Sequence, residues 1–150
     1  MRKLLLATAA LALAGAGVAF ASGSAQVTIN SSLDASCSVS DATTTLTLSG
    51  TVAQTGHFTT TCNFSAADLH VQFQSDKGGV YNSVENVTAP YTLTYNAGAH
   101  DSSTLTGAGV TIDHASGSTS PVIRDYDVAL NAPLSVAGSY ADTLTITVTP

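Results

Sequence analysis

Basic and aromatic side chains are scarce in this sequence, and each scarcity excludes a class of function. Lys and Arg together number four, against ten Asp and Glu, and tryptophan is absent. Nucleic-acid binding requires a basic stripe that offsets phosphate charge, and the sequence contains none. Anionic membrane surfaces are disfavoured for the same reason. The lack of tryptophan also weakens the case for a sugar-binding platform of stacked rings.

Helical periodicity and further long hydrophobic runs are missing after residue 21. No stretch there repeats its apolar residues with a period of 3.6 over ten residues, so long amphipathic helices are not expected. Charged residues make up only 9% of the chain, while Ser and Thr are abundant. That composition suits strands and polar turns. We expect no membrane span in the mature chain, because no second apolar run follows.

The first 21 residues have the composition of a secretory signal peptide. Arg2 and Lys3 form a basic start, residues 4–18 are apolar, and Ala-Phe-Ala at 19–21 matches an A-x-A cleavage site. We therefore expect the mature chain to span 22–150 and to be secreted. A chain of about 130 residues corresponds to one domain that buries roughly two thirds of its unfolded surface.

Cysteine occurs twice, at Cys37 and Cys62. In a chain sent to an oxidising compartment, two cysteines are expected to form one disulfide rather than two free thiols. Cys62 also lies on the apolar face of a predicted strand, as a bridge between strands requires. Closing a loop of this length stabilises a fold by about 3–4 kcal/mol in the chain-entropy model.

Strict alternation of apolar and polar residues marks both ends of the mature chain. Leu144, Ile146 and Val148 alternate with threonines over 140–149, after a turn at Gly138-Ser139. The segment 25–33 alternates in the same way, with four apolar residues on one face: Ala25, Val27, Ile29 and Leu33. A period of two with β-branched residues predicts strands with one face in a core.

Short alternating segments separated by turn residues fill the middle of the chain. Turns or loops are expected at 54–56, 76–79, 82–86, 96–109 and 115–120. Seven or eight short strands at this spacing predict an all-β antiparallel sandwich. The strands expected between the two ends cover 37–39, 43–52, 57–64, 69–74, 90–95, 110–113 and 122–130.

Side chains that could bind metal or catalyse are present without a recognisable motif. Asp125 and Asp127 could present two carboxylates for calcium, although a solvated acidic face is the simpler interpretation. No G-x-S-x-G motif occurs, and the one glutamate, Glu85, lies in a predicted loop. We expect no enzymatic activity, metal or cofactor. Histidines are scattered without the paired spacing of zinc or copper ligands, at His57, His70, His100 and His114.

Three motifs together resemble the subunits of archaic chaperone–usher pili and the similar spore coat protein U family. The first is the alternating QVTIN at 26–30, just before the first cysteine. The second is CSV at 37–39 with TTC at 60–62, and the third is GSYADTLTITV at 138–148. The resemblance covers the first forty and the last thirteen mature residues, while the middle is matched by its strand pattern.

The resemblance implies an immunoglobulin-like sandwich, residues 37–150, that lacks its last strand. Residues 22–36 would be the donor segment, with Ala25, Val27, Ile29 and Leu33 entering the groove of another subunit. The groove edge would be the strand of Tyr140, Leu144, Ile146 and Val148. The two cysteines, Cys37 and Cys62, would form the disulfide. The implied partners are identical or related subunits, a periplasmic chaperone and an outer-membrane usher, and the implied location is the cell surface, reached through the periplasm.

A second interpretation remains open at this point. Residues 25–33 could instead fold back as the first strand of a self-contained secreted sandwich that binds glycans or forms a spore-coat or matrix layer. Five tyrosines are candidates for a sugar platform, although core edges are the simpler role for them: Tyr81, Tyr91, Tyr95, Tyr126 and Tyr140.

Overall fold

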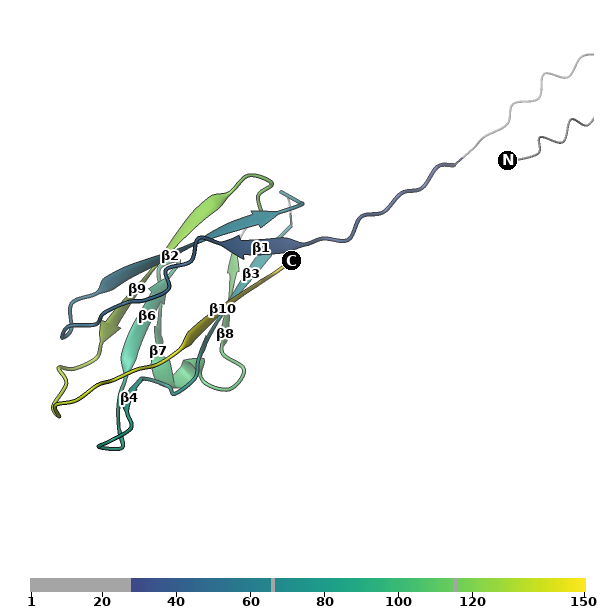
Figure 1. Cartoon of the computed structure of the whole chain (residues 1–150). Helices are drawn as coiled ribbons and strands as arrows, with labels where there is room; N and C mark the ends of the chain where they lie inside the picture. Colours follow the sequence, from purple (N-terminus) through teal and green to yellow (C-terminus); the bar gives the residue numbers. More distant parts are fainter. Residues whose placement is uncertain (1–27, 66, 115) are drawn as a thin grey trace, which may run out of the picture. The chain divides into compact units, whose positions relative to one another are not determined.

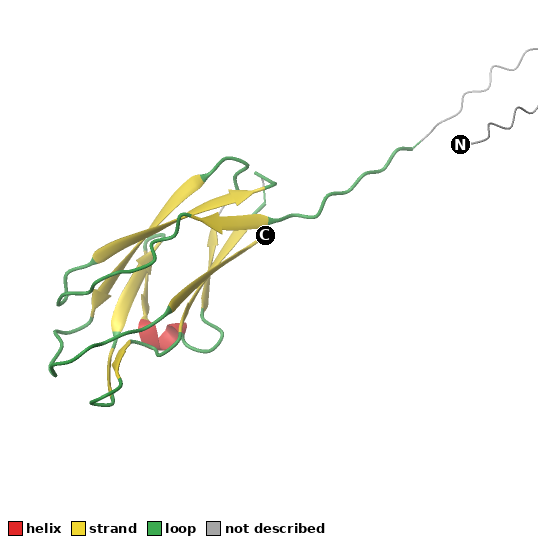
Figure 2. Ribbon diagram, in the orientation of Figure 1, coloured by secondary structure: helices red, strands yellow, loops and turns green. Residues whose placement is uncertain are grey.

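Antiparallel strands make up almost all regular structure in the described part of the chain. A computed structural model describes residues 28–65, 67–114 and 116–150, and Figures 1 and 2 show the path of its strands and of one short 3-10 helix. Residues 33–150 form one compact unit, to which residues 28–32 do not belong. The predicted all-β antiparallel sandwich is confirmed.

Two sheets form the layers of the sandwich. A smaller sheet places β3 in its centre, and a β4–β5 hairpin and helix η1 lie outside both sheets. The larger sheet has the order β1 (Cys37–Ser40), β2 (Gln54–Cys62), β9 (Val122–Leu130), β6 (Tyr91–Tyr95), β7 (Gly98–Asp101). The remaining elements are β10 (Leu144–Thr149), β3 (Leu69–Ser75), β8 (Val110–His114), β4 (Val80–Asn82), β5 (Val87–Ala89) and η1 (Ser102–Leu105).

The core lies between the inner faces of the two sheets. Leu69, Val71 and Phe73 of β3 are fully buried, as their alternation predicts. From the larger sheet, Phe58 and Tyr95 pack against Phe73, with ring centroids 6.2 Å and 5.0 Å from it. These tilted and edge-on contacts are the arrangements that aromatic rings favour. Apolar alternation and aromatic packing therefore define the interior.

One predicted turn is wrong because its glycine serves packing instead. Residues 54–56 were expected to turn the chain, yet all three belong to β2. The ring of Tyr126 lies over Gly56, where an added Cβ would come within 2.4 Å of the ring. Gly56 therefore allows the close approach of an aromatic ring within the sheet, a use of glycine that local sequence does not distinguish from a turn.

The predicted loop at 96–109 is also partly wrong, since it contains β7 and helix η1. The Asp101 carboxylate accepts hydrogen bonds from the backbone N–H and the hydroxyl of Ser103, at 2.9 Å and 2.6 Å, and so caps η1. These bonds hold the pKa of Asp101 below its ordinary value. Leu105 is fully buried, so η1 contributes an anchor to the core.

The hairpin β4–β5 departs from the expected loop at 82–86 as well. Asn82, predicted to begin a loop, ends β4 and is only 1% exposed. Its side-chain oxygen accepts hydrogen bonds from the backbone N–H groups of Val84 and Glu85, at 3.0 Å and 3.2 Å. Asn82 thereby supplies the acceptor that the turn needs in a partly buried position.

Buried tyrosines are expected to make the fold less stable at high pH. Burial raises the pKa of Tyr91, Tyr95 and Tyr126 above the ordinary value, at Tyr95 against the opposing effect of Arg124. A pKa that is higher in the folded state means that the fold favours the neutral phenol. Each buried tyrosine therefore contributes fully to stability below the unfolded pKa of about 10, and this contribution is lost as the pH rises through the higher folded pKa.

We therefore expect the three buried tyrosines to ionise only as the protein unfolds in alkali. An alkaline titration that follows tyrosinate absorbance and circular dichroism together would show this. Reversible ionisation of all five tyrosines in one step, with the fold intact, would contradict the expectation.

Candidate functional site

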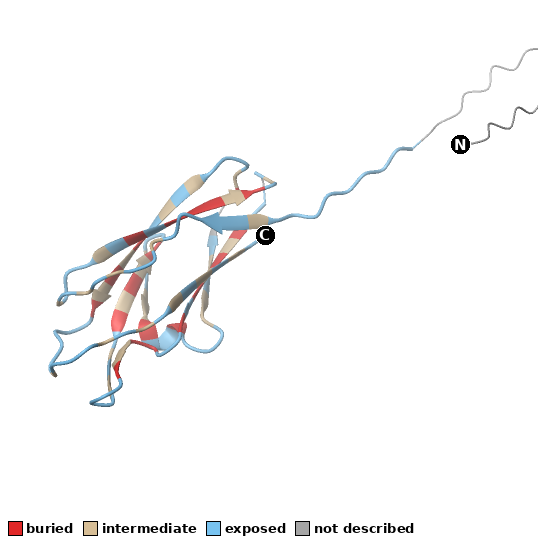
Figure 3. Ribbon diagram, viewed as in Figure 1, coloured by how far each residue is buried: buried red, intermediate tan, exposed pale blue. Residues whose placement is uncertain are grey.

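β10 is an edge strand of the smaller sheet, as β8 is on the other side of β3. β10 pairs with β3 through all six of its residues, and among the described residues no second strand pairs with β10. Ile146 and Val148 lie opposite Phe73 and Val71, which are fully buried, yet they are themselves only half-buried. Figure 3 shows this contrast in exposure between β10 and β3. The inner face of β10 is therefore not fully covered.

The facing edge of the larger sheet is incomplete in the same way. Val39 of β1 lies opposite Thr60 on the inner face, yet it is 37% exposed. After β1, Asp41 adopts a positive φ of 46°, which turns the chain out of the ladder. The strand predicted at 43–52 is therefore not formed, although Leu46 and Leu48 point inward as expected and are half-buried.

Thr43 attaches this crossing segment to the sheet. Its backbone N–H donates to the carbonyl of His57 at 2.8 Å, and its hydroxyl accepts from the His57 backbone N–H at 2.9 Å. Within the described ranges, residues 44–53 make no backbone–backbone hydrogen bond to another segment. The segment thus lies beside the core without completing a sheet.

A groove of about 680 Å³ separates the crossing segment from the start of β10. Its base is formed by residues of β9 and β6 whose side chains also belong to the core. Leu144 and Tyr140, two of the predicted groove residues, line it, whereas Ile146 and Val148 lie further along β10. Tyr140 precedes the strand, so the prediction that it belongs to the strand is corrected. The apolar and aromatic side chains of the lining include Leu46, Leu48, Tyr91, Tyr126, Val128, Leu130, Leu134, Tyr140 and Leu144, and the polar ones are Thr43, Thr44, Thr45, Thr47, Asp142 and Thr143.

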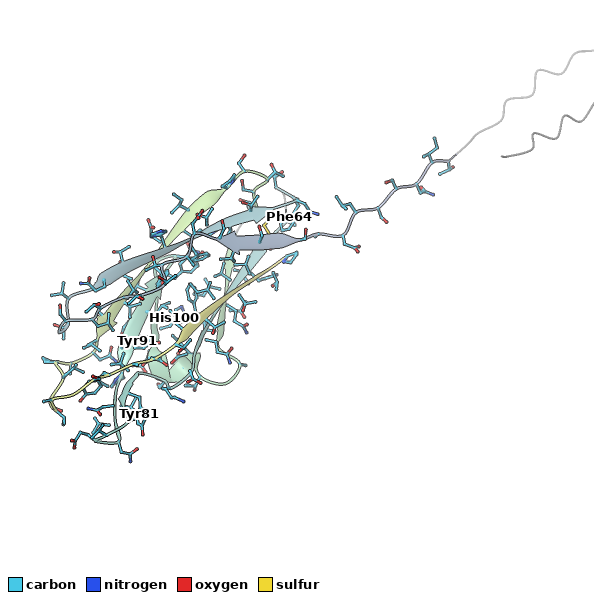
Figure 4. The ribbon with its side chains drawn as sticks, in the orientation of Figure 1. Phe64, Tyr81, Tyr91 and His100 are labelled. Carbon is cyan, nitrogen blue, oxygen red and sulfur yellow. A yellow bond between two sulfur atoms is a disulfide. The ribbon has the colours of Figure 1, made fainter. Side chains whose placement is uncertain are left out.

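Asp142 fixes the wall of the groove just before β10. Its carboxylate accepts hydrogen bonds from the hydroxyls of Ser75 and Tyr91, at 2.6 Å and 2.9 Å. It also accepts from the backbone N–H groups of Lys77 and Thr143, at 2.9 Å and 2.8 Å. Tyr91 is labelled in Figure 4. Four donors on one carboxylate hold β3, β6 and the groove wall in a fixed relation.

The hairpin β4–β5 braces the same wall from outside. Tyr81 and Ala141 exchange two backbone hydrogen bonds of 2.9 Å and 3.0 Å. Gly138 has a φ of 141° and lies so close to Asn82 that an added Cβ would come within 2.4 Å of its amide nitrogen. The turn predicted at Gly138 therefore allows the wall to pack closely against the hairpin.

The disulfide Cys37–Cys62 is formed, as predicted, between directly opposed residues of β1 and β2. Beyond it, Asn63 continues the pairing of the two segments by one further residue, because its backbone N–H donates to the Ser36 carbonyl at 3.0 Å. The compact unit consequently begins at Leu33, four residues before the expected boundary at Cys37.

Part of the predicted donor segment can be located. Ile29 and Leu33 are 88% and 85% exposed, and residues 28–33 form no strand in this single chain. Ala25 and Val27 lie outside the described residues. The two large apolar side chains that can be assessed are thus available to a partner.

The other candidate side chains are not brought together into a site. The rings of Tyr91, Tyr95 and Tyr126 lie in the core and cannot offer an open stacking face. Asp127 accepts a hydrogen bond from Thr55 at 2.6 Å. No group of three or more His, Cys, Asp and Glu side chains suited to a metal ion occurs in the part of the chain that the structure describes.

Asp142, Asn63 and Asn82 make the structural contacts that sequence patterns missed. Asp142 and Asn63 lie just outside a strand and Asn82 is the last residue of β4, and all three are polar residues of a kind that is common in turns throughout this chain. Their hydrogen-bond partners are far away in the sequence. Asp142 bonds to Ser75, 67 residues away, Asn63 to Ser36, 27 residues away, and Asn82 to Ala137, 55 residues away. No local signal distinguishes them from solvent-exposed turn residues.

A comparison with protein-family models and one with curated proteins each found no match to this chain. Over 28–65, 67–114 and 116–150, no helix is both long and apolar enough to cross a membrane.

Proposed function

We propose that this protein is a non-enzymatic structural subunit of a surface fibre that polymerises by donor-strand exchange. In this proposal the groove beside β10 accepts residues 22–36 of a second copy, as the resemblance to archaic chaperone–usher pilins and spore coat protein U implies. The observation that carries the proposal is the half-covered apolar face of β10, next to a groove of about 680 Å³.

An unpaired strand edge beside a groove of mixed apolar and polar lining favours the addition of a strand. The free N–H and C=O groups of β10 can pair with an incoming backbone, while alternate side chains of that strand enter the groove. Left open, such an edge is an aggregation hazard. The geometry thus favours an extended peptide as the occupant over a compact small molecule.

The N-terminal segment has the length and pattern that this edge requires. Nine residues, 25–33, extend over about 30 Å as a strand, which is enough to cover the six residues of β10, about 20 Å long. Ile29 and Leu33 are almost fully exposed, and burying such side chains contributes about 1.5–3 kcal/mol each. Completing a groove therefore offers these side chains a favourable environment.

Transfer of the segment to another copy would produce an open fibre. A head-to-tail contact uses two different surfaces, so it propagates unless the rotation closes a ring. A subunit with a vacant groove would need protection before assembly, which is the role that the resemblance assigns to a periplasmic chaperone, with an outer-membrane usher for export.

Deletion of residues 22–33 tests the proposal directly. We expect the truncated domain to form no fibres by electron microscopy or light scattering, yet to bind a synthetic peptide of residues 22–36, because the groove lies within the remaining unit. A peptide with Ile29→Asp and Leu33→Asp is the matched control and should bind at least tenfold more weakly, since a charge would replace each buried side chain.

Two outcomes would overturn the proposal. One is normal polymerisation of the truncated domain, and the other is equal binding of the native and the aspartate peptides. A full-length chain that stays monomeric, unfolds reversibly and retains glycans on an array would instead support a self-contained secreted binding or coat protein.

A further inference from the structure

The chain enters β1 through a stretch that the domain holds in place. Besides the backbone bond from Asn63 to the Ser36 carbonyl, the Ser36 N–H donates to Asn63 Oδ1 at 2.9 Å. Asn63 Nδ2 in turn donates to the Asp34 carbonyl at 2.7 Å. These three residues, Asp34, Ser36 and Asn63, are called the exit clamp below. The clamp continues the β1–β2 pairing past the disulfide.

Occupation of a subunit's own groove would require a different path at these residues. β1 begins and β10 ends at the same end of the sandwich, and the two strands are in contact (Figure 1). A segment 25–33 lying beside its own β10 would therefore have to reverse direction before Cys37. Residues 34–36 would then be the turn of a hairpin, and the exit clamp would be broken.

Without such a constraint, filling from within would compete strongly with filling by a neighbour. A short tether holds its segment at an effective concentration in the millimolar range. Separate subunits at micromolar concentration cannot match that value by diffusion alone. Assembly into a fibre therefore needs a feature that disfavours the intramolecular pathway.

We propose that the exit clamp is this feature, and that Asn63 is a positioning residue that directs the N-terminal segment to a second copy. By keeping residues 34–36 in line with β1, Asn63 prevents the hairpin that would fill the subunit's own groove. This inference rests on the proposed function, since it concerns the choice of groove by the same segment.

The full mature chain with Asn63→Ala tests the inference. The variant keeps the disulfide and the backbone bond of residue 63 but loses both side-chain bonds. We expect its ratio of monomer to fibre, measured by size-exclusion chromatography after refolding at low micromolar concentration, to rise by about tenfold, which corresponds to about 1.4 kcal/mol. Those monomers should not take up labelled peptide 22–36, because their grooves are filled.

Two further variants control for general effects. Asn131→Ala also removes two side-chain hydrogen bonds, to Thr92 and Asp101, both 2.7 Å long, and should assemble like the unmodified chain. Ser36→Pro removes the donor on the other side of the clamp without changing β2, and should shift the ratio in the same direction as Asn63→Ala.

The outcomes separate the clamp from the proposed function. If the domain lacking residues 22–33 binds the peptide, but Asn63→Ala and Ser36→Pro both assemble within twofold of the unmodified chain, the clamp inference is overturned and the proposed function stands. If that domain does not bind the peptide, the proposed function is overturned, and the inference with it.

Discussion

Replacement of Leu144 by aspartate should abolish binding of the N-terminal peptide, with a loss of affinity of roughly 100-fold or more. Leu144 opens β10, lines the groove and is half-buried against the core. An incoming strand would enclose its side chain. A carboxylate enclosed without a partner costs several kcal/mol, and about 2.7 kcal/mol already corresponds to 100-fold.

Thr145→Asp is the matched control for this prediction. Thr145 is the next residue of β10, pairs with Gln74 and points to the exposed outer face. The same charge on the same strand should leave peptide affinity within about threefold of the unmodified domain, because it stays in solvent. The comparison needs only titration of the domain lacking residues 22–33 with labelled peptide.

Leu46→Asp extends the test to the opposite wall. Leu46 lines the groove from a segment outside both sheets, so this substitution disturbs no sheet hydrogen bonds. We expect a loss of affinity similar to that of Leu144→Asp. Equal affinity of Leu144→Asp, Leu46→Asp and Thr145→Asp would show that the peptide binds elsewhere.

Removal of the disulfide by Cys37→Ala with Cys62→Ala should lower the free energy of unfolding by about 3–4 kcal/mol. The bridge closes a loop between residues 25 positions apart and attaches β1, a four-residue edge strand whose side chains are mostly exposed. An edge strand of this kind has few other contacts to hold it on the sheet.

Urea denaturation of the double variant, monitored by circular dichroism, measures this effect. Reduction of the unmodified protein is the parallel control and should lower the urea midpoint by a similar amount. A change smaller than about 1 kcal/mol would mean that the β1–β2 ladder is sufficient by itself, and that the bridge contributes little to stability.

Alternation predicted the strands best where one face of a strand lies toward the core and the other lies toward solvent. Val122–Leu130 is observed with the predicted bounds, and Leu69–Ser75 is longer by one residue. Prediction failed where a residue serves a distant partner, as Gly56 does beneath Tyr126. It also failed at 43–52, where apolar residues alternate but the chain leaves the ladder at Asp41.

The candidate site was predictable only in part for the same reason. Tyr140 and Leu144 could be selected because the closing segment alternates. Asp142 lies between them, yet three of its four hydrogen bonds come from Ser75, Lys77 and Tyr91, which β3, the turn after it and β6 bring to it. Pattern therefore located the edge of the groove but not the residue that fixes it.

By itself, the sequence determined the all-β class, the inward-facing apolar residues and the single disulfide, because alternation and cysteine content are local properties of the chain. The tertiary structure alone decided which edge remains open, where the groove lies and which groups Asn63 and Asp142 bond to. Those features depend on which strands become neighbours, and the order of strands in a sheet is set by contacts between residues far apart in sequence.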